Sequence, residues 1–307
     1  MTKALRYAEF GGIEQLKWEE VPEQHAAAGQ LRVHVTTVGL NPMDWLVMKT
    51  PGIAEQFGVH LPQIFAYDFA GVVDEVGADV TNYKVGDRVF GTTYDGAAAE
   101  QIILSAGNST RNRVFKTPDS VSDDVAATLG VGGLTAANCL MTIGLTADDT
   151  VLIGGAAGGV GVFAVQLAKL RGARVIGTSA PSTFDFLEKL GAEPVAYGDG
   201  LAESVANLGL TAAIDLYSHD VVHLALAEGI PPEKITSIIM YPPLPDGVKT
   251  STGGAGTADD MAEILSALTE GKLTVPIAGK YAISDYEAAI NEQMSRHVHG
   301  KIIISLD

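Results

Sequence analysis

The sequence predicts an α/β fold that combines a β-rich part with a doubly wound parallel sheet. Two observations predict it: short strand-like segments separated by Gly and Pro fill the chain up to about Lys116, and strand-like runs alternate with helical segments after Pro118. Strands that follow one another form antiparallel sheets, whereas strands that alternate with helices form parallel sheets with right-handed crossovers. The 307 residues are enough for one large domain or two medium ones.

Three segments make up the expected β-rich part. Residues 31–38 alternate apolar and polar side chains, as a half-buried strand does. Residues 70–77 form a second short strand, and residues 85–91 form a turn that leads into a third. We expect these strands to be antiparallel.

The second part begins with a helix expected over residues 122–143, with Ser120 or Ser122 as its N-cap. The strands expected after it are 150–153, 174–178, 194–197 and 212–216. The helices expected between them are 159–170 and 184–190, and the pattern continues through 223–226 and 235–240. Helices over 261–269 and 285–294 and a last strand over 301–306 complete the chain, and this tail can return to the first part.

Composition and charge exclude several classes of protein. Hydrophobic residues make up 47% and charged residues 19%, which argues against disorder. The net charge of −17, from 20 basic and 37 acidic side chains, leaves little material for a basic face, so nucleic-acid and membrane partners are not expected. The uncharged stretch 151–168 carries five glycines and is expected to be a strand, a turn and a helix rather than a membrane span.

The single cysteine and the N-terminus bear on the compartment. One cysteine makes no internal disulfide and no zinc site that needs several thiolates. The first ten residues lack the apolar core of a signal peptide. We therefore expect a cytoplasmic protein.

A glycine-rich turn joins the apolar strand 151–153 to the helix after it. Its pattern, Ala156-x-Gly158-x-x-Gly161, matches a dinucleotide-binding fingerprint with Ala in the first place. Small residues there let backbone N–H groups approach a pyrophosphate at the positive end of a helix. The expected cofactor-binding residues of the turn are Ala156, Gly158, Gly159, Val160 and Gly161. A tight turn that only packs the helix against the strand is the alternative.

The end of the next strand indicates which dinucleotide binds. NAD-preferring sites place a carboxylate there, on the ribose 2′-OH. This chain has none, and Ser179, Ser182 and Thr183 offer neutral donors to a 2′-phosphate. Thr178, at the end of the same strand, is also an expected cofactor-binding residue. NADPH is therefore favoured over NADH. A capped turn before the helix at Phe184 explains the same residues, and both interpretations can hold together.

Several segments, taken in order, resemble one enzyme family. They are residues 38–45, 61–73, 85–91, 133–137, 158–161 and 299–304. Their sequences and order are similar to those of the medium-chain dehydrogenase/reductase superfamily, and within it to the zinc-independent quinone oxidoreductase branch that includes zeta-crystallin. The resemblance implies a GroES-like domain over residues 1–120 and 262–307 and a Rossmann domain over 121–261. It also implies an active site in the cleft between them and a homodimer.

The resemblance also bears on zinc. Metal-dependent members of the superfamily carry Cys at the position of Asn41, His-Glu at Tyr67-Asp68 and a four-cysteine lobe after Phe90. This chain has none of those thiols, and its only cysteine is Cys139. No metal site is therefore expected. His297 and His299 lack a third ligand and are expected at the surface.

The resemblance implies roles for five residues. Asn41 lies beside the nicotinamide and the acceptor, or serves only as the turn residue before Pro42. Tyr67 donates to the acceptor oxygen, or is a half-buried aromatic. Thr135 contacts the nicotinamide end of the cofactor or caps a helix, and Tyr197 lies near the 2′-phosphate or is an edge aromatic. Asp44 occurs in the family motif too and is expected to fix the turn by hydrogen bonding. The catalytic candidates are Asn41, Tyr67 and Asp44.

Three functions stay open at this point. The first is an NADPH-dependent reductase of a quinone or a related α,β-unsaturated carbonyl, because such acceptors take a hydride without a Lewis acid. The second is an enoyl-thioester reductase. Its long acyl carrier would need a basic entry patch, and the strong negative charge of this chain argues against one. The third is a non-catalytic NADPH-binding protein. Leu46, where relatives often carry an aromatic, and the lack of Lys or Arg over 181–184 depart from the family pattern.

Overall fold

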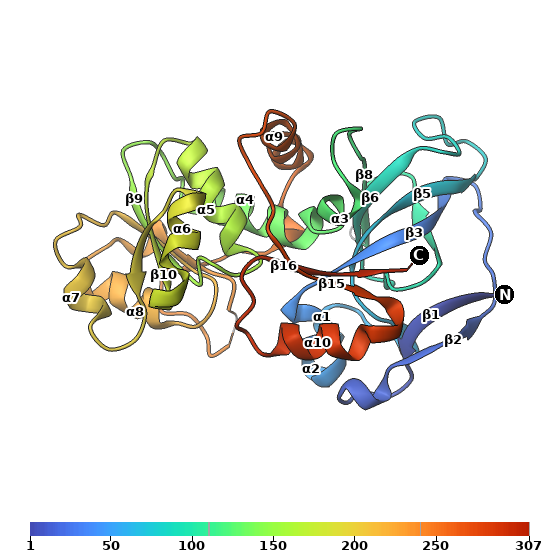
Figure 1. Cartoon of the computed structure of the whole chain (residues 1–307), viewed down its shortest axis with the longest axis horizontal. Helices are drawn as coiled ribbons and strands as arrows, with labels where there is room; N and C mark the ends of the chain where they lie inside the picture. The colour runs from blue at the N-terminus through green and yellow to red at the C-terminus, as the bar shows by residue number, and fades with distance from the viewer. Residues whose placement is uncertain (110, 240, 307) are drawn as a thin grey trace. The chain divides into compact units, whose positions relative to one another are not determined.

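The computed structural model describes residues 1–109, 111–239 and 241–306, and the chain divides into two compact units. Unit 1 comprises Met1–Val131 and Ile277–Asp307, and unit 2 comprises Gly132–Pro276 (Figure 1). The divisions therefore fall later in the chain than the expected boundaries at 120 and 261. The second boundary falls after 261 because the helix Ala258–Thr269 packs within unit 2. Its Ile264 Cδ1 lies 3.1 Å from the position that a side-chain carbon on Gly133 would take.

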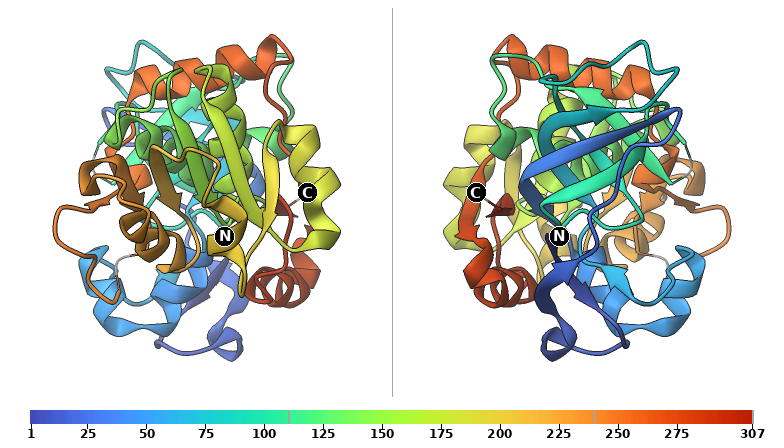
Figure 2. Two further views of the ribbon diagram at one scale, coloured as in Figure 1. Left: turned by 90° about the vertical axis from the view of Figure 1, so that its left-hand side faces the viewer. Right: turned by 90° about the vertical axis from the view of Figure 1, so that its right-hand side faces the viewer.

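Unit 1 is built on two sheets. The seven-stranded sheet has the order β15-β16-β3-β5-β6-β8, with β7 also paired to β3, and the smaller sheet has the order β2-β1-β4. β3, β5 and β6 lie side by side and antiparallel, as expected from the sequence (Figure 2). The strands are β1 (Thr2–Tyr7), β2 (Lys17–Val21), β3 (Gln30–Leu40), β4 (Gln63–Ile64), β5 (Asp68–Val76), β6 (Arg88–Thr93), β7 (Gln101–Ser105), β8 (Asn112–Lys116), β15 (Ile277–Ala282) and β16 (Lys301–Ser305).

Short helices join these strands. They are α1 (Pro42–Lys49), α2 (Pro51–Gln56), α3 (Asp123–Ala126) and α10 (Tyr286–Met294). The C-terminal strand β16 runs antiparallel to β3, with Ile302 opposite Leu40. The predicted return of the tail to the first part of the chain is therefore confirmed.

Unit 2 holds a six-stranded parallel sheet of order β11-β10-β9-β12-β13-β14. Ranked by sequence, this order is 3-2-1-4-5-6, that of the Rossmann fold, so the predicted doubly wound sheet is confirmed. Helices lie on both faces (Figure 2). The strands are β9 (Thr150–Gly154), β10 (Arg174–Ser179), β11 (Glu193–Ala196), β12 (Ala212–Asp215), β13 (Ile235–Ser237) and β14 (Lys249–Thr250). The helices are α4 (Leu134–Thr142), α5 (Gly161–Leu170), α6 (Phe184–Leu190), α7 (Leu201–Val205), α8 (Asp220–Ala227) and α9 (Ala258–Thr269).

The prediction of a single helix over 122–143 is wrong for the middle of that segment. The structure has α3, then a π-helical segment over Leu129–Gly133, then α4. Glycines weaken the helix there, and the Val131 N–H donates to the Asp68 carboxylate at 2.9 Å. The segment 235–240, expected to continue the pattern, forms β13 over Ile235–Ser237, and its last position, Met240, lies outside the described residues.

The uncharged stretch 151–168 folds as the sequence predicts. It consists of β9, the glycine turn and most of α5, all within unit 2. Among the described residues, no helix combines the length and the apolar character that crossing a bilayer requires.

Candidate functional site

The glycine turn between β9 and α5 has room for backbone only. Gly155 has a φ of +70°, which favours glycine. A side-chain carbon on Gly161 would lie 2.4 Å from the carbonyl oxygens of Gly155 and Ala156, far inside van der Waals contact. On Gly158 it would lie 3.3 Å from the Gly155 oxygen, which is tight but tolerable. The close approach of helix to strand therefore depends on Gly161 above all.

The same turn presents backbone donors. In the described part of the chain, the N–H groups of Gly159 and Val160 donate to no backbone carbonyl. They precede α5, whose N-terminal end carries partial positive charge. Ala156 is fully buried, and its Cβ lies 2.9 Å from the position that a side-chain carbon on Gly177 of β10 would take. The turn thus fits a pyrophosphate, and its first position accepts Ala because that residue packs inward.

The carboxyl ends of β10 and β11 carry the residues predicted near the ribose. The buried Thr178 hydroxyl accepts a hydrogen bond from the Gly155 N–H at 3.2 Å, so it supports the glycine turn. The buried Ser179 hydroxyl donates to the Ala180 carbonyl at 3.1 Å. Ser182 is exposed directly after β10, and Tyr197, 57% exposed, follows β11 with its N–H 3.4 Å from the Ser179 oxygen. The structure therefore gathers these residues at one edge of the sheet.

The end of β12 contributes residues that sequence reasoning missed. The buried Asp215 carboxylate accepts hydrogen bonds from the N–H groups of Tyr217, Ser218 and Val221 at 2.9–3.1 Å. The Cβ of Tyr217 lies 3.1 Å from the position of a side-chain carbon on Gly155. This loop therefore borders the glycine turn at the point where the strand order reverses, which is where ligands bind in such sheets. The available signal was a carboxylate directly after the apolar run 212–214.

Thr135 lies in the first turn of α4 and is 5% exposed. The segment just before it reaches the glycine turn, because a side-chain carbon on Gly132 would lie 3.1 Å from the Gly159 oxygen. The N-terminal end of α4 is therefore close to the residues predicted to bind the dinucleotide.

In unit 1, Asn41 is the N-cap of α1. Its N–H donates to the Asp44 carboxylate at 2.7 Å, and Pro42 occupies the first helical position. Asp44 thus holds the turn, as predicted from the sequence. Both Asn41 and Asp44 are buried.

The Asn41 side chain is part of a buried polar network. Its Nδ2 donates to Asp68 at 2.9 Å, and Lys301 Nζ donates to its Oδ1 at 2.6 Å. Lys301, only 2% exposed, also donates to the Leu40 carbonyl at 3.2 Å. Sequence reasoning gave Lys301 no role, although a lysine that opens the apolar strand 301–304 is an unusual choice and a usable signal.

Burial sets the protonation behaviour of this network. It raises the pKa of Asp68 to about 6, although the Lys301 charge and the Asn41 hydrogen bond oppose the shift. Burial also raises the pKa of Asp44 well above its usual value and lowers the pKa of Lys301. Asp44 Oδ1 has no hydrogen-bond partner among the described residues. Two carboxyl groups and one ammonium thus share a dry interior, where full ionisation is costly.

Tyr67 belongs to a small aromatic cluster beside this network. Its ring centroid lies 5.5 Å from that of Tyr94, which in turn lies 5.9 Å from Phe57. Burial raises the pKa of Tyr67 far above its usual value, so the phenol keeps its proton. Arg111 donates to the carbonyls of Phe57, Gly58 and Tyr94 at 3.2–3.3 Å and so ties the segments that carry the rings.

Comparisons with known proteins decide the family. Residues 27–144 match the alcohol dehydrogenase GroES-like domain. The chain is 30% identical over 338 residues to a chloroplast envelope quinone oxidoreductase homolog of Arabidopsis thaliana, covering 99% of this chain and 98% of that one. Quinone oxidoreductase from Coxiella burnetii has a similar structure, with a TM-score of 0.80, 25% identity and coverage of 100% and 99%. A mycobacterial protein solved in complex with NADPH gives a TM-score of 0.83 at 25% identity, over 99% of this chain and 100% of that one.

The chain belongs to the medium-chain dehydrogenase/reductase superfamily. Within it, the likeness to quinone oxidoreductases confirms the predicted branch, and it makes this chain an oxidoreductase.

Few side chains that could bind a metal ion lie together among the described residues. Among residues 1–109, 111–239 and 241–306, no group of three or more His, Cys, Asp or Glu could hold a metal ion. Burial raises the pKa of the Cys139 thiol to about 12, so it stays protonated, and His297 and His299 are exposed. The predicted lack of a metal site stays a prediction.

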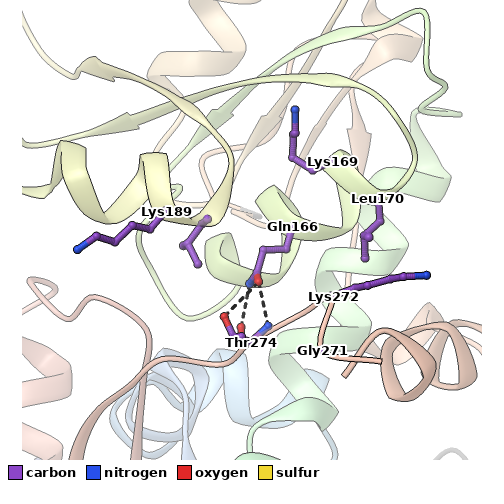
Figure 3. Close-up of a pocket in the computed structure, with 8 residues that line it drawn as sticks. Gln166, Lys169, Leu170, Lys189, Gly271, Lys272 and Thr274 are labelled. Carbon is purple, nitrogen blue, oxygen red and sulfur yellow. Dashed lines mark hydrogen bonds between the residues drawn. The ribbon is translucent and has the colours of Figure 1, made fainter. Parts of the chain in front are cut away.

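A separate pocket of about 280 Å³ lies in unit 2. Lys169, Lys189 and Lys272 line it, but their ammonium groups point in different directions (Figure 3). Lys272 pairs with Glu270, and the Gln166 amide is bonded to the backbone of Thr274. The pocket lacks the convergent polar groups of a ligand site. None of the residues predicted to bind the dinucleotide lines it.

Proposed function

We propose that this oxidoreductase is an NADPH-dependent reductase that transfers hydride to a quinone, or to a related α,β-unsaturated carbonyl, without a metal ion. The observation that carries the proposal is the glycine turn at the carboxyl edge of a 3-2-1-4-5-6 parallel sheet, with no carboxylate at the end of β10. The quinone oxidoreductase relatives support the acceptor class.

The residues of unit 2 fit a dinucleotide. Gly159 and Val160 would donate backbone hydrogen bonds to its pyrophosphate, and Ser182 and Tyr197 would lie toward the adenosine ribose. The segment 180–183 is uncharged, so it does not repel a 2′-phosphate. When bound, the reduced dinucleotide supplies a hydride.

The residues of unit 1 would serve the acceptor. Tyr67 keeps its proton and would donate a hydrogen bond to the acceptor oxygen, and the Asn41 amide would provide a second donor. A quinone that receives one hydride and one proton becomes a hydroquinone, and solvent can supply that proton. No thiolate or imidazole is needed, which suits a chain with Asn41 and Tyr67 where metal-dependent relatives carry Cys and His.

Acceptor competition tests the proposal. NADPH oxidation is measured with 1,4-benzoquinone, 9,10-phenanthrenequinone and crotonyl-CoA, on protein whose zinc content is known. Turnover of the quinones with no bound zinc supports the proposal. Preference for crotonyl-CoA identifies an enoyl-thioester reductase instead. Tight NADPH binding without any turnover identifies a non-catalytic NADPH-binding protein. The homodimer and the cytoplasmic location stay predictions.

A further inference from the structure

The Asn41 amide lies between two buried opposite charges. Lys301 Nζ is 2.6 Å from its oxygen, and the Asp68 carboxylate is 2.9 Å from its nitrogen. The three residues are 3%, 2% and 0% exposed, respectively. A flipped amide would place its N–H against the ammonium and its oxygen against the carboxylate, and both contacts would be repulsive. The two charges therefore fix one orientation of the amide.

Each charge is anchored to a rigid part of unit 1. Lys301 opens β16 and also donates to the Leu40 carbonyl at the end of β3. Asp68 opens β5, opposite Gly39 of β3, and its second oxygen accepts the Val131 N–H at 2.9 Å. Three adjacent strands thus hold the network, so the amide cannot turn without breaking several bonds.

This arrangement leaves one hydrogen of the amide unused. The Oδ1 atom accepts from Lys301, and one Nδ2 hydrogen goes to Asp68. Within the described part of the chain, the second Nδ2 hydrogen has no acceptor at hydrogen-bond distance. The cation on Oδ1 draws electron density from the amide, which makes that remaining N–H a stronger donor.

We propose that Lys301 and Asp68 are positioning residues that hold Asn41 so that its second Nδ2 hydrogen bonds to the carbonyl oxygen of the acceptor. The inference rests on the proposed function. Negative charge grows on the acceptor oxygen as hydride arrives at the conjugated ring. A donor that is already oriented then stabilises the transition state more than the ground state.

Non-additive kinetics test this inference. Turnover of 9,10-phenanthrenequinone is measured at saturating NADPH for wild type, Asn41→Ala, Lys301→Met and the double variant. Asn41→Ala is expected to lower kcat roughly 100-fold, as loss of one such donor does. Lys301→Met is expected to lower kcat at least about 10-fold, with the Kd of NADPH unchanged. The double variant should be no slower than Asn41→Ala, because Lys301 acts only through that amide.

Two further variants separate positioning from stability. Arg88→Met removes another partly buried cation of unit 1, one that binds Asp123 and the Val121 carbonyl, and should lower the Tm without changing kcat. Should Lys301→Met fail to fold, Asp68→Asn releases the same amide from its other side and should lower kcat similarly.

The outcomes are distinguishable. Losses that multiply in the double variant, or a folded Lys301→Met variant with kcat within twofold of wild type, overturn the inference. Wild type that turns over no acceptor overturns the proposed function. In that case, binding of 9,10-phenanthrenequinone to the NADP⁺-saturated protein decides the inference. Binding at least tenfold weaker in both single variants supports it, and equal binding overturns it.

Discussion

Replacing Gly161 by Ala is expected to weaken NADPH binding strongly. The added carbon would lie 2.4 Å from the carbonyl oxygens of both Gly155 and Ala156, whereas ordinary contact needs about 3.4 Å. The turn must therefore retreat by about 1 Å, which stretches hydrogen bonds from its N–H groups to a pyrophosphate beyond their useful range. Each such bond to a charged group contributes about 1.5–3 kcal/mol, so losing one raises the Kd of NADPH roughly 10–100-fold.

The assay is tryptophan fluorescence quenching by NADPH, checked by calorimetry, on a graded series of variants. Gly158→Ala meets one oxygen at 3.3 Å and should raise the Kd only a few-fold, because a shift of a few tenths of an ångström relieves that contact. Gly107→Ala meets nothing within 4 Å and should leave the Kd unchanged. A Gly161→Ala variant that folds and binds NADPH within threefold of wild type refutes the assignment of the turn.

Three further predictions concern other parts of the protein. Ser182→Asp adds a carboxylate where the 2′-phosphate is expected, so it should raise the Kd of NADPH roughly tenfold and leave the Kd of NADH unchanged. Equal changes in the two Kd values contradict this prediction. A similar effect of Ser105→Asp, a control substitution on unit 1, contradicts it as well. The pKa of Asp68 near 6 exceeds its unfolded value of 3.8, so the contribution of Asp68 to the free energy of unfolding should fall by up to about 3 kcal/mol as pH rises from 4 to 6. Denaturant titrations of Asp68→Asn should lack this pH-dependent part, and an unchanged slope counts against it. Arg111→Met should lower the Tm by a few degrees and raise the KM for the quinone more than it lowers kcat. Arg111→Lys should show part of this effect. An unchanged KM for the quinone in Arg111→Met argues against a role for the aromatic cluster in binding the acceptor.

The Rossmann sheet could be predicted because its signals are local. β9, β10 and β12 are short apolar runs separated by helical segments, and the glycine turn follows β9 directly. The handedness of the crossovers narrows the possible strand orders, and the structure supplies the order itself. The break in the helix over 122–143 could not be predicted in the same way. The glycines at 130, 132 and 133 are visible in the sequence, but the hydrogen bond between Val131 and Asp68, which also shapes this segment, joins residues that are distant in sequence.

The candidate site of unit 1 could be predicted only in part from the sequence, for the same reason. Asn41 and Asp44 form a local capping motif that a sequence shows directly. The partners of the Asn41 side chain come from positions 68 and 301, and only the pairing of β3 with β5 and β16 brings them together. A lone lysine in an apolar strand signals an unusual burial, but the sequence does not show what it bonds.

The two candidate half-sites depend on different physics, which makes them separable by mutation. The glycine turn works because side chains are absent, so changes at Gly161 alter a distance between backbones and hence affinity. The network around Asn41 works through buried charges, so changes at Lys301 alter the orientation and strength of one donor and hence the rate. Gly161→Ala should therefore change the Kd of NADPH and spare kcat at saturation, while Lys301→Met does the reverse. Parallel losses of both quantities in both variants would mean that affinity and rate share one structural cause, and the division of roles between the two units would then be wrong.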